Sequence, residues 1–309
     1  MTTRRLLRSL ILAIASIVLA IILAFAYCFI SEETNVFNNV LKAAEQGDAK
    51  EQYALGLMYY DGGVFRKQDY SQAVKWFRKS AEQGNTKAQF NLGEMYADGE
   101  GVTQDYQEAV KWYKKAAEQG NAEAQSALGY MYQIGYGVTK DYQEAHKWLR
   151  KAAEQGNADG QFHLGVTYAV GLGVAKDCQG AFNWFKKAAE QGNAIYQSIL
   201  ASSYRNGDCV TRNYEEAIKW YKKSAEQGDA IAQHALGEMY AKGEGVAADY
   251  IEAYKWTILA AEQGDPNAVE ERDSLKKKMS PQQIDEAEKI AKEFKPKINN
   301  ATLKADETK

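Results

Sequence analysis

Paired glycines that could wrap a phosphate group are the first sign of chemistry in this sequence. The pattern Gly-x-Gly occurs at 99–101, 135–137, 171–173 and 243–245. A loop that binds a dinucleotide needs a third glycine and follows a β-strand, so that the pyrophosphate meets the start of a helix. None of the four segments has that third glycine, and each lies between two helical patterns. We therefore interpret them as turns and expect no cofactor.

A serine with a lysine three residues later could act as a nucleophile on an acyl group, as in enzymes that bind or hydrolyse β-lactams. Segment 274–277 (Ser-Leu-Lys-Lys) has this spacing, but no Lys-Thr-Gly follows it. The three histidines, His146, His163 and His234, are far apart in the sequence, and it contains no His-Glu-x-x-His or Cys-x-x-Cys spacing. We therefore expect neither an enzyme nor a metal site.

Two cysteines could form a cross-link. Cys178 stands where related segments of the chain have tyrosine, and Cys209 stands where they have glycine. In an oxidising compartment such a pair favours a disulfide between neighbouring structural units. Packed helices lie about 8–10 Å apart, whereas the Cα atoms of a disulfide lie within about 7 Å, so the loop of Cys209 would have to lean back. A Cys178–Cys209 disulfide and two free small residues remain alternatives.

The elements that must position these residues repeat along the chain. The period is 37 residues once and then 36 residues five times. A period of this length is typical of stacked helical hairpins rather than of a single globular core. The marker of the period is Ala-Glu-Gln-Gly, which ends at Gly47, Gly84, Gly120, Gly156, Gly192, Gly228 and Gly264.

One copy, from residue 85 to residue 120, predicts two helices. Asn85 can cap the first helix, and apolar residues follow on one face from Ala88 to Tyr96. Asp105 begins the second helix, and Glu108 three residues later predicts a capping box. A glycine inside a helix costs about 1 kcal/mol relative to alanine, so a recurrent one predicts close approach of the second helix. These glycines are Gly56, Gly93, Gly129, Gly165 and Gly237.

The repeated pattern resembles the Sel-one-like repeat, a relative of the tetratricopeptide repeat. Its residues are A-x-x-A-Q-x-x-L-G-x-M-Y-x-x-G-x-G-V-x-x-D-Y-x-x-A-x-x-W-x-x-x-A-A-E-Q-G, and the resemblance covers about residues 36–295. It implies an all-α fold, a right-handed α/α superhelical solenoid of six helix-turn-helix repeats. It also implies a scaffold or adaptor for protein partners.

The N-terminus predicts a membrane segment. Arg4, Arg5 and Arg8 precede an uncharged run of 22 residues from Ser9 to Ile30. As a helix this run reaches about 33 Å, enough for a hydrocarbon core of about 30 Å. We interpret it as a signal-anchor whose arginines stay cytoplasmic, with a cleaved signal peptide as the alternative. The repeats are then periplasmic and anchored to the inner membrane, or secreted or periplasmic if the segment is cleaved.

Five segments follow from these patterns. They are a membrane segment at 1–33, a half-repeat cap at 34–47, six repeats at 48–264, a C-terminal helical cap at 265–295 and a disordered tail at 296–309. The net charge is −3 and both signs are interspersed, so no basic stripe indicates nucleic acid.

Three positions of the first helix vary between copies, at i, i+4 and i+8, and the first helices of such solenoids line the concave side. We expect a groove there, apolar in its N-terminal half, that binds an extended peptide or an amphipathic helix; the alternative is a merely solvated face. We expect no small-molecule substrate. The predicted partner-binding residues are Tyr53, Leu57, Phe90, Glu94, Tyr130, Ile134, Phe162 and Val166.

The sequence therefore predicts a membrane-tethered, non-catalytic scaffold with extracytoplasmic repeats. An envelope enzyme or glycan-binding protein that acts on cell-wall material is one alternative, and an exported or host-directed adaptor is another. The fifth repeat departs from the pattern at Ala201, Ser203 and Cys209, where glycine, methionine and glycine are usual. Because the stability of a repeat array is a sum over neighbours, we expect this repeat to open first unless a disulfide holds it.

Overall fold

The computed structural model describes residues 34–63 and 67–297. Every regular element in these ranges is a helix, as the sequence predicts, and these ranges contain no strand. The predicted membrane segment at 1–33 lies outside the described residues, as does the tail beyond residue 297. None of the described helices combines the length and the apolar composition that a membrane crossing requires.

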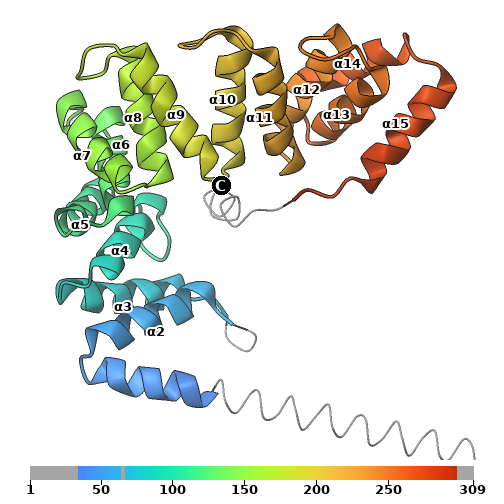
Figure 1. The fold of residues 1–309 in the computed structure, drawn as a ribbon. Coiled ribbons are helices and arrows are strands. Elements are labelled where there is room, and N and C mark those ends of the chain that lie inside the picture. Colours follow the sequence, from blue (N-terminus) through green and yellow to red (C-terminus); the bar gives the residue numbers. More distant parts are fainter. Residues whose placement is uncertain (1–33, 64–66, 298–309) are drawn as a thin grey trace, which may run out of the picture. The chain divides into compact units, whose positions relative to one another are not determined.

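The chain falls into two compact units, which we name unit 1 (up to Asn121) and unit 2 (from Ala122). Unit 1 has a helical stretch at 34–45 and two hairpins, and unit 2 has four hairpins and two further helices (Figure 1). We number the hairpins as repeats one to six. In unit 1 the helices are α2 (Ala49–Asp61), α3 (Tyr70–Glu82), α4 (Thr86–Asp98) and α5 (Tyr106–Glu118).

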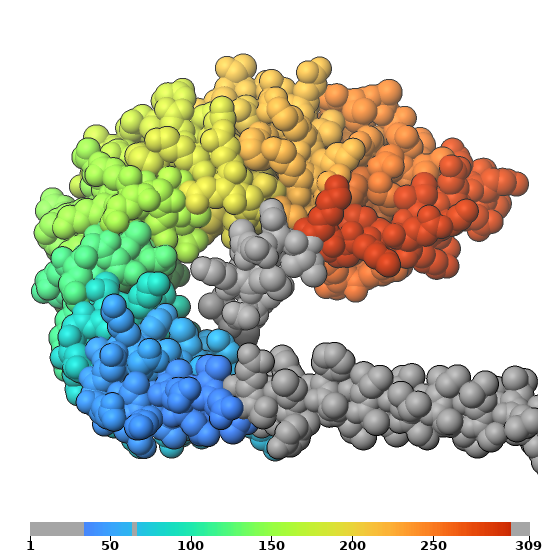
Figure 2. Space-filling model, turned by 60° about the horizontal axis from the view of Figure 1, so that its bottom comes forward, coloured from blue at the N-terminus to red at the C-terminus, as the bar shows by residue number. Residues whose placement is uncertain are grey.

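In unit 2 each hairpin lies beside its sequence neighbours, so colours follow one another in order in the space-filling view (Figure 2). Repeats three to six comprise α6 (Ala122–Ile134), α7 (Tyr142–Glu154), α8 (Ala158–Val170), α9 (Cys178–Glu190), α10 (Ala194–Asn206), α11 (Tyr214–Glu226), α12 (Ala230–Lys242) and α13 (Tyr250–Glu262); α14 (Pro266–Lys276) and α15 (Pro281–Glu293) follow.

Short polar residues begin the helices where the sequence predicts. The Asn85 side chain accepts a hydrogen bond from the backbone N–H of Ala88, and Asp105 accepts from that of Glu108. The predicted capping box at Asp105 is wrong. Its backbone N–H donates instead to the carbonyl of Tyr96 at 2.9 Å, and the Glu108 carboxylate accepts from Lys111 at 2.9 Å. This hydrogen bond to Tyr96 already satisfies the backbone N–H of Asp105, which the Glu108 carboxylate would accept from in a capping box.

The glycines inside the first helices allow close packing of the hairpin, which confirms the steric prediction. A Cβ atom added to Gly93 would lie 2.6 Å from the ring of Tyr113, and one added to Gly165 would lie 2.7 Å from that of Phe185. Real Cβ atoms do not approach so closely, so a larger residue would push the two helices apart. Repeat five has the fully buried Ala201 at this position.

Invariant glutamines connect the hairpins. The side-chain amide of Gln89 donates to the carbonyl of Ala81 in the preceding repeat at 3.0 Å, and Gln119 donates to the Gln89 oxygen at 2.7 Å. Satisfied buried amides of this kind specify the stacking, because an unpaired one would cost free energy. The intra-repeat bond recurs in Gln83–Gln52, Gln155–Gln125, Gln191–Gln161, Gln227–Gln197 and Gln263–Gln233.

The end of the chain covers the last hairpin of unit 2. Ser280 and Gln283 form a reciprocal capping box at the start of α15. After α15 the ring of Phe294 packs edge-on against Trp256, with 5.6 Å between centroids. The backbone N–H of Lys297 then donates to the carbonyl of Glu226 at the end of α11, at 2.7 Å. The ring of Phe294 thus covers part of the apolar side of repeat six, and the bond of Lys297 holds the segment against repeat five.

Candidate partner-binding surface

The C-terminal end of each first helix presents the same three positions, which we call the loop-end positions. Two lie in the helix four residues apart, and the third lies in the loop just after the glycine that ends the helix. The backbone there is the same in different repeats, because the N–H of Glu100 donates to the carbonyl of Met95 and that of Glu244 donates to Met239, both at 3.0 Å. The residues are Glu94, Asp98 and Glu100 in repeat two, Tyr130, Ile134 and Tyr136 in three, Val166, Val170 and Leu172 in four, Ser202, Asn206 and Asp208 in five, and Glu238, Lys242 and Glu244 in six.

The first of the variable positions predicted from the sequence is governed by packing. Tyr53, Phe90 and Phe162 are half-buried, and each ring lies against an aromatic ring of the second helix in its own hairpin. This position is therefore less free to fit a partner than its variation indicates. The centroid distances are 5.7 Å for Tyr53–Phe77, 5.9 Å for Phe90–Tyr113 and 5.6 Å for Phe162–Phe185.

The second variable position differs between the two units. In unit 1, Leu57 is half-buried, and the Glu94 carboxylate accepts a hydrogen bond from the hydroxyl of Tyr113 at 2.9 Å. In unit 2, Val166 is half-buried, whereas Tyr130 is 40% exposed. The same structural position is thus polar and hydrogen-bonded in repeat two and apolar in repeats three and four.

Repeats three and four expose apolar side chains at their loop ends. Tyr130, Tyr136 and Val170 are 40%, 49% and 62% exposed, and Ile134 is half-buried beside them in the same helix as Tyr130. Tyr136 is missing from the sequence prediction, although its loop position varies between copies and could have signalled it. We name Tyr130, Ile134, Tyr136, Val166, Val170 and Leu172 the apolar loop-end patch.

Repeat two carries carboxylates at all three loop-end positions, and we name Glu94, Asp98 and Glu100 the acidic loop-end set. Among the residues that the structure describes, neither Asp98 nor Glu100 forms an ion pair. Tyr60 of repeat one faces this set: burial raises the pKa of Tyr60, and the charges of Glu100 and Glu94 raise it further. Burial also raises the pKa of Asp98.

Repeat six has cations at the corresponding place. Arg205, which stands in repeat five where repeat one has Tyr60, donates from Nη1 to Glu238 Oε2 at 2.8 Å and from Nε to Glu244 Oε2 at 3.0 Å. Lys242 donates to the other Glu238 oxygen at 3.0 Å. The Arg205 side chain is only 18% exposed, so this guanidinium depends on the two carboxylates.

His234 lies next to this network. Its Nδ1 is 3.3 Å from Asp265 Oδ2 and its Nε2 is 3.0 Å from Glu271 Oε2, and the hydrogen bond to Glu271 raises the pKa of His234. His234, Glu238 and Glu271 can bring one ligand atom each within 4.8 Å of one another, as a metal ion would need. Both Glu238 oxygens already face cations, so the arrangement serves as an ion-pair network.

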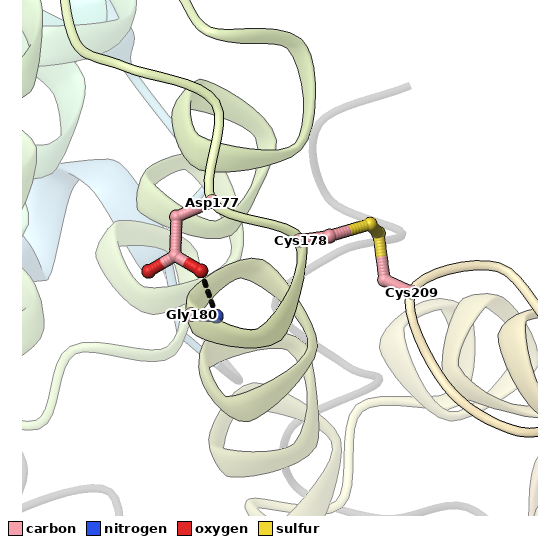
Figure 3. Close-up of a disulfide and its surroundings, with 4 residues drawn as sticks. All are labelled: Asp177, Cys178, Gly180 and Cys209. Atoms are coloured by element: carbon pink, nitrogen blue, oxygen red, sulfur yellow. Dashed lines mark hydrogen bonds between the residues drawn. A yellow bond between two sulfur atoms is a disulfide. The ribbon is translucent and has the colours of Figure 1, made fainter.

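The two cysteines of the solenoid meet between repeats four and five (Figure 3). Cys178 is the first residue of α9, directly after Asp177, which caps the helix by accepting from the N–H of Gly180. The two sulfur atoms are bonded, and the Cα atoms lie 4.8 Å apart, within the range of a disulfide. Cys209 has a positive φ of 60°, like the loop glycines that it replaces.

The loop of Cys209 does not need to lean back, because the same approach occurs in other repeats. A Cβ atom added to Gly245 would lie 2.5 Å from the Cβ of Tyr214, the first residue of the preceding second helix. Gly101 meets the backbone of Tyr70 in the same way, and Gly173 meets that of Tyr142. The separation of 8–10 Å expected between packed helices does not apply to a loop that rests on a helix start.

Comparisons with known structures agree with this architecture. The protein c5321 of uropathogenic Escherichia coli, a protective antigen with an SLR fold, is 41% identical with a TM-score of 0.73, over 83% of this chain and 56% of c5321. A Sel1 repeat protein of Oxalobacter formigenes is 35% identical with a TM-score of 0.65, over 74% of this chain and 99% of that one. The present chain thus spans little more than half the length of c5321.

The family comparison gives the same result. The Sel1 repeat model matches residues 52–85, 86–121, 122–157, 158–193, 194–229 and 230–265. A search of curated proteins found no match. The six matches cover most of the chain, and the chain therefore belongs to the Sel1 repeat family, whose members generally serve as non-catalytic scaffolds for protein interactions.

Proposed function

We propose that this chain is a membrane-tethered scaffold that binds a segment of a partner protein at the loop ends of its first helices. The observation that carries the proposal is the apolar loop-end patch of unit 2, where Tyr130, Tyr136 and Val170 are 40%, 49% and 62% exposed. Large apolar side chains that gather at a solvent-exposed place favour a binding surface over a solvated one. The two tyrosines further favour a binding surface, because a tyrosine ring buries a large area on binding while its hydroxyl can hydrogen-bond to water.

The patch suits a short apolar segment. Its side chains come from equivalent positions of two adjacent hairpins, so an extended peptide or one face of a helix can contact both. Packed rings adjoin this surface: Tyr130 lies 4.8 Å from the ring of His163, and Phe162, one turn before Val166 in α8, stacks on Tyr196 at 4.6 Å. A supported surface loses little side-chain entropy when a partner binds.

The tether and the location belong to the proposal as well. The arginines before residue 9 and the uncharged run from Ser9 to Ile30 support a location of the repeats on the extracytoplasmic side. The similarity to c5321, a protective antigen, agrees with this location. The right-handed superhelical path is the form we expect for the repeat array.

The experiment compares two double variants of the full-length chain in an affinity capture from the envelope of the source cell. Tyr130→Ser with Val170→Ser removes exposed contacts of the patch. Ile195→Ser with Ile231→Ser removes two apolar residues that are at least as exposed as Tyr130, at 50% and 70%, from the opposite ends of first helices. We expect the first variant to lose a partner protein that the wild type and the second variant retain.

Thermal unfolding provides the control, because all four side chains are exposed and their removal should change stability by less than about 0.5 kcal/mol. Recovery of the same proteins with both variants would contradict the proposal. Recovery of peptidoglycan fragments instead of a protein would favour the alternative of a cell-wall-binding protein.

A further inference from the structure

Repeat three carries a glutamine next to the apolar loop-end patch. Gln133 stands in α6 at the position that Arg205 has in repeat five and Tyr60 has in repeat one. Arg205 reaches the first and third loop-end positions of the next repeat, at 2.8 Å and 3.0 Å. The charges of Glu94 and Glu100, at the same two positions of repeat two, act on Tyr60. By this correspondence we place Gln133 against the first and third loop-end positions of repeat four.

The residues at these two positions give the amide of Gln133 no polar group to bind. They are Val166 and Leu172, whose side chains neither donate nor accept hydrogen bonds. Among the described residues, Oε1 of Gln133 is buried and has no hydrogen-bond partner. A buried carbonyl oxygen in this state costs free energy, and a donor from a ligand would recover it.

The fold of the repeat does not require an amide at this position. The equivalent residue is alanine in repeats two, four and six, which form first helices of the same length. These residues are Ala97, Ala169 and Ala241. An apolar surface that carries one polar group is the usual composition of a binding site, where the polar group fixes the orientation of the ligand. Gln133 thus adds this feature to the apolar loop-end patch of unit 2.

We propose that Gln133 determines the specificity of the apolar loop-end patch by binding the backbone of an extended partner segment. Its Oε1 accepts from a backbone N–H of the segment, and its Nε2 donates to a backbone carbonyl. The side chain as a whole is half-buried, and the last torsion of a glutamine side chain turns over a broad range, so the amide can reach a partner on the surface. The inference rests on the proposed scaffold function and adds the conformation of the partner segment.

The amide selects an extended segment over a helix. Inside a helix each backbone N–H is bonded to the carbonyl four residues earlier, so a helix that lies on the patch offers Gln133 none of these donors. An extended segment has free N–H and carbonyl groups along its edges, and its side chains alternate between two sides. The apolar side chains of one side can then lie on both hairpins, beside Tyr130 and Val170.

The test begins with peptides selected from a phage library of random linear peptides on the full-length chain in mild detergent. A selected peptide is then synthesised with one backbone amide at a time replaced by an ester, which removes a single N–H and keeps every side chain. We expect one ester to weaken binding to the wild type about fivefold or more. The same ester should have no further effect on Gln133→Met, which keeps the length of the side chain and removes the amide.

Gln282→Met, at an exposed glutamine of α15, is the matched control and should bind every peptide as the wild type does. Thermal unfolding of Gln133→Met should show an unchanged or higher midpoint, because the variant removes a buried oxygen that has no partner among the described residues. A loss of binding by this variant would then not come from misfolding.

Three results would overturn the inference. They are peptides that become helical when bound, as NMR of a labelled peptide reports, peptides that bind Gln133→Met as tightly as the wild type, and esters that weaken binding to both proteins equally. The scaffold function stands in each case if the peptides still need Tyr130 and Val170. Selection of no peptide that needs these two residues overturns both proposals.

Discussion

Repeats two and six share one backbone and differ in what surrounds their loop-end glutamates. In repeat six, Arg205 and Lys242 neutralise Glu238 and Glu244. In repeat two, Glu94 accepts a hydrogen bond from Tyr113, and Glu100 forms no ion pair among the described residues. The same sequence feature therefore joins adjacent hairpins by ion pairs in repeat six, whereas in repeat two it faces the hydroxyls of Tyr113 and Tyr60.

The difference shows where function can be found in a repeat protein. Positions that stay constant, such as Gln89 and Gln119, form the bonds that stack the hairpins. Positions that vary become informative only when the facing residue of the adjacent copy is known. Glu244 faces the guanidinium of Arg205, whereas Glu100 faces the phenol of Tyr60.

The largest expected effect concerns the cross-link that gives unit 2 a stability that unit 1 lacks. Cys178→Ser with Cys209→Ser should lower the free energy of unfolding of unit 2 by about 3 kcal/mol, because the bond closes a loop with a sequence separation of 31 residues. Hydrogen exchange followed by mass spectrometry should show faster exchange in repeats four and five and an unchanged exchange rate in unit 1.

A second pair serves as the control for this cross-link. Cys178→Tyr with Cys209→Gly restores the residues of the other repeats, so the loop can pack without a bond and the loss should be smaller. Alkylation of Cys178 or Cys209 in the unreduced, denatured wild type would contradict the disulfide.

The next effect tests the comparison directly, because it should be larger in repeat six than in repeat two. Glu238→Gln with Glu244→Gln should destabilise unit 2 by about 2 kcal/mol, since the guanidinium of Arg205 is largely buried and loses both charged partners. Glu94→Gln with Glu100→Gln should cost unit 1 less, because a glutamine oxygen can still accept from Tyr113 and Glu100 forms no ion pair among the described residues. Urea unfolding measures both, and equal losses in the two variants would show that repeat two is already neutralised.

A smaller effect is expected when repeat two is converted to the arrangement of repeat six. Tyr60→Arg should stabilise unit 1 by about 1 kcal/mol at low ionic strength, and the gain should shrink in high salt because the new pair is partly exposed. Tyr60→Gln is the control, since it adds no charge. If the arginine variant is no more stable than the glutamine variant, the two carboxylates are not placed to hold a guanidinium.

The smallest effect is a pH dependence confined to repeat six. The hydrogen bond to Glu271 raises the pKa of His234 in the folded state. The stability that His234 contributes is therefore fully present below its unfolded pKa of about 6.5, and it is lost as the pH rises through the folded value. The stability difference between wild type and His234→Gln should thus shrink with rising pH. Repeat two has Phe90 at this position, so exchange in unit 1 should show no such trend.

The sequence predicts the helices, their caps and the close packing of the hairpins because these features are local or recur in every copy. Asn85 caps α4 and Gly93 meets Tyr113, both as expected. The capping box at Asp105 does not form, because the backbone N–H of Asp105 donates to the carbonyl of Tyr96 in the other helix of the hairpin. A pattern along the sequence does not reveal this contact.

The candidate surface is predictable only in part. Sequence variation between the repeats identifies candidate positions in the first helices. It does not distinguish Phe90, which packs on Tyr113, from Tyr130, which is 40% exposed. Nor does it show that Arg205 reaches two glutamates of the next repeat, since that depends on which faces of adjacent hairpins meet. Packing and pairing across repeats decide which variable residues are available to a partner.

Site-specific photo-crosslinking in the source cell tests the central claim most directly. A photoreactive phenylalanine derivative would replace Tyr130, Tyr136 or, as a control at the opposite end of a first helix, Ile231, which is 70% exposed. We predict that the probes at Tyr130 and Tyr136 cross-link to one partner protein and that the probe at Ile231 does not. Cross-links from Ile231 alone, or from none of the three positions, would contradict a partner that binds at the loop ends.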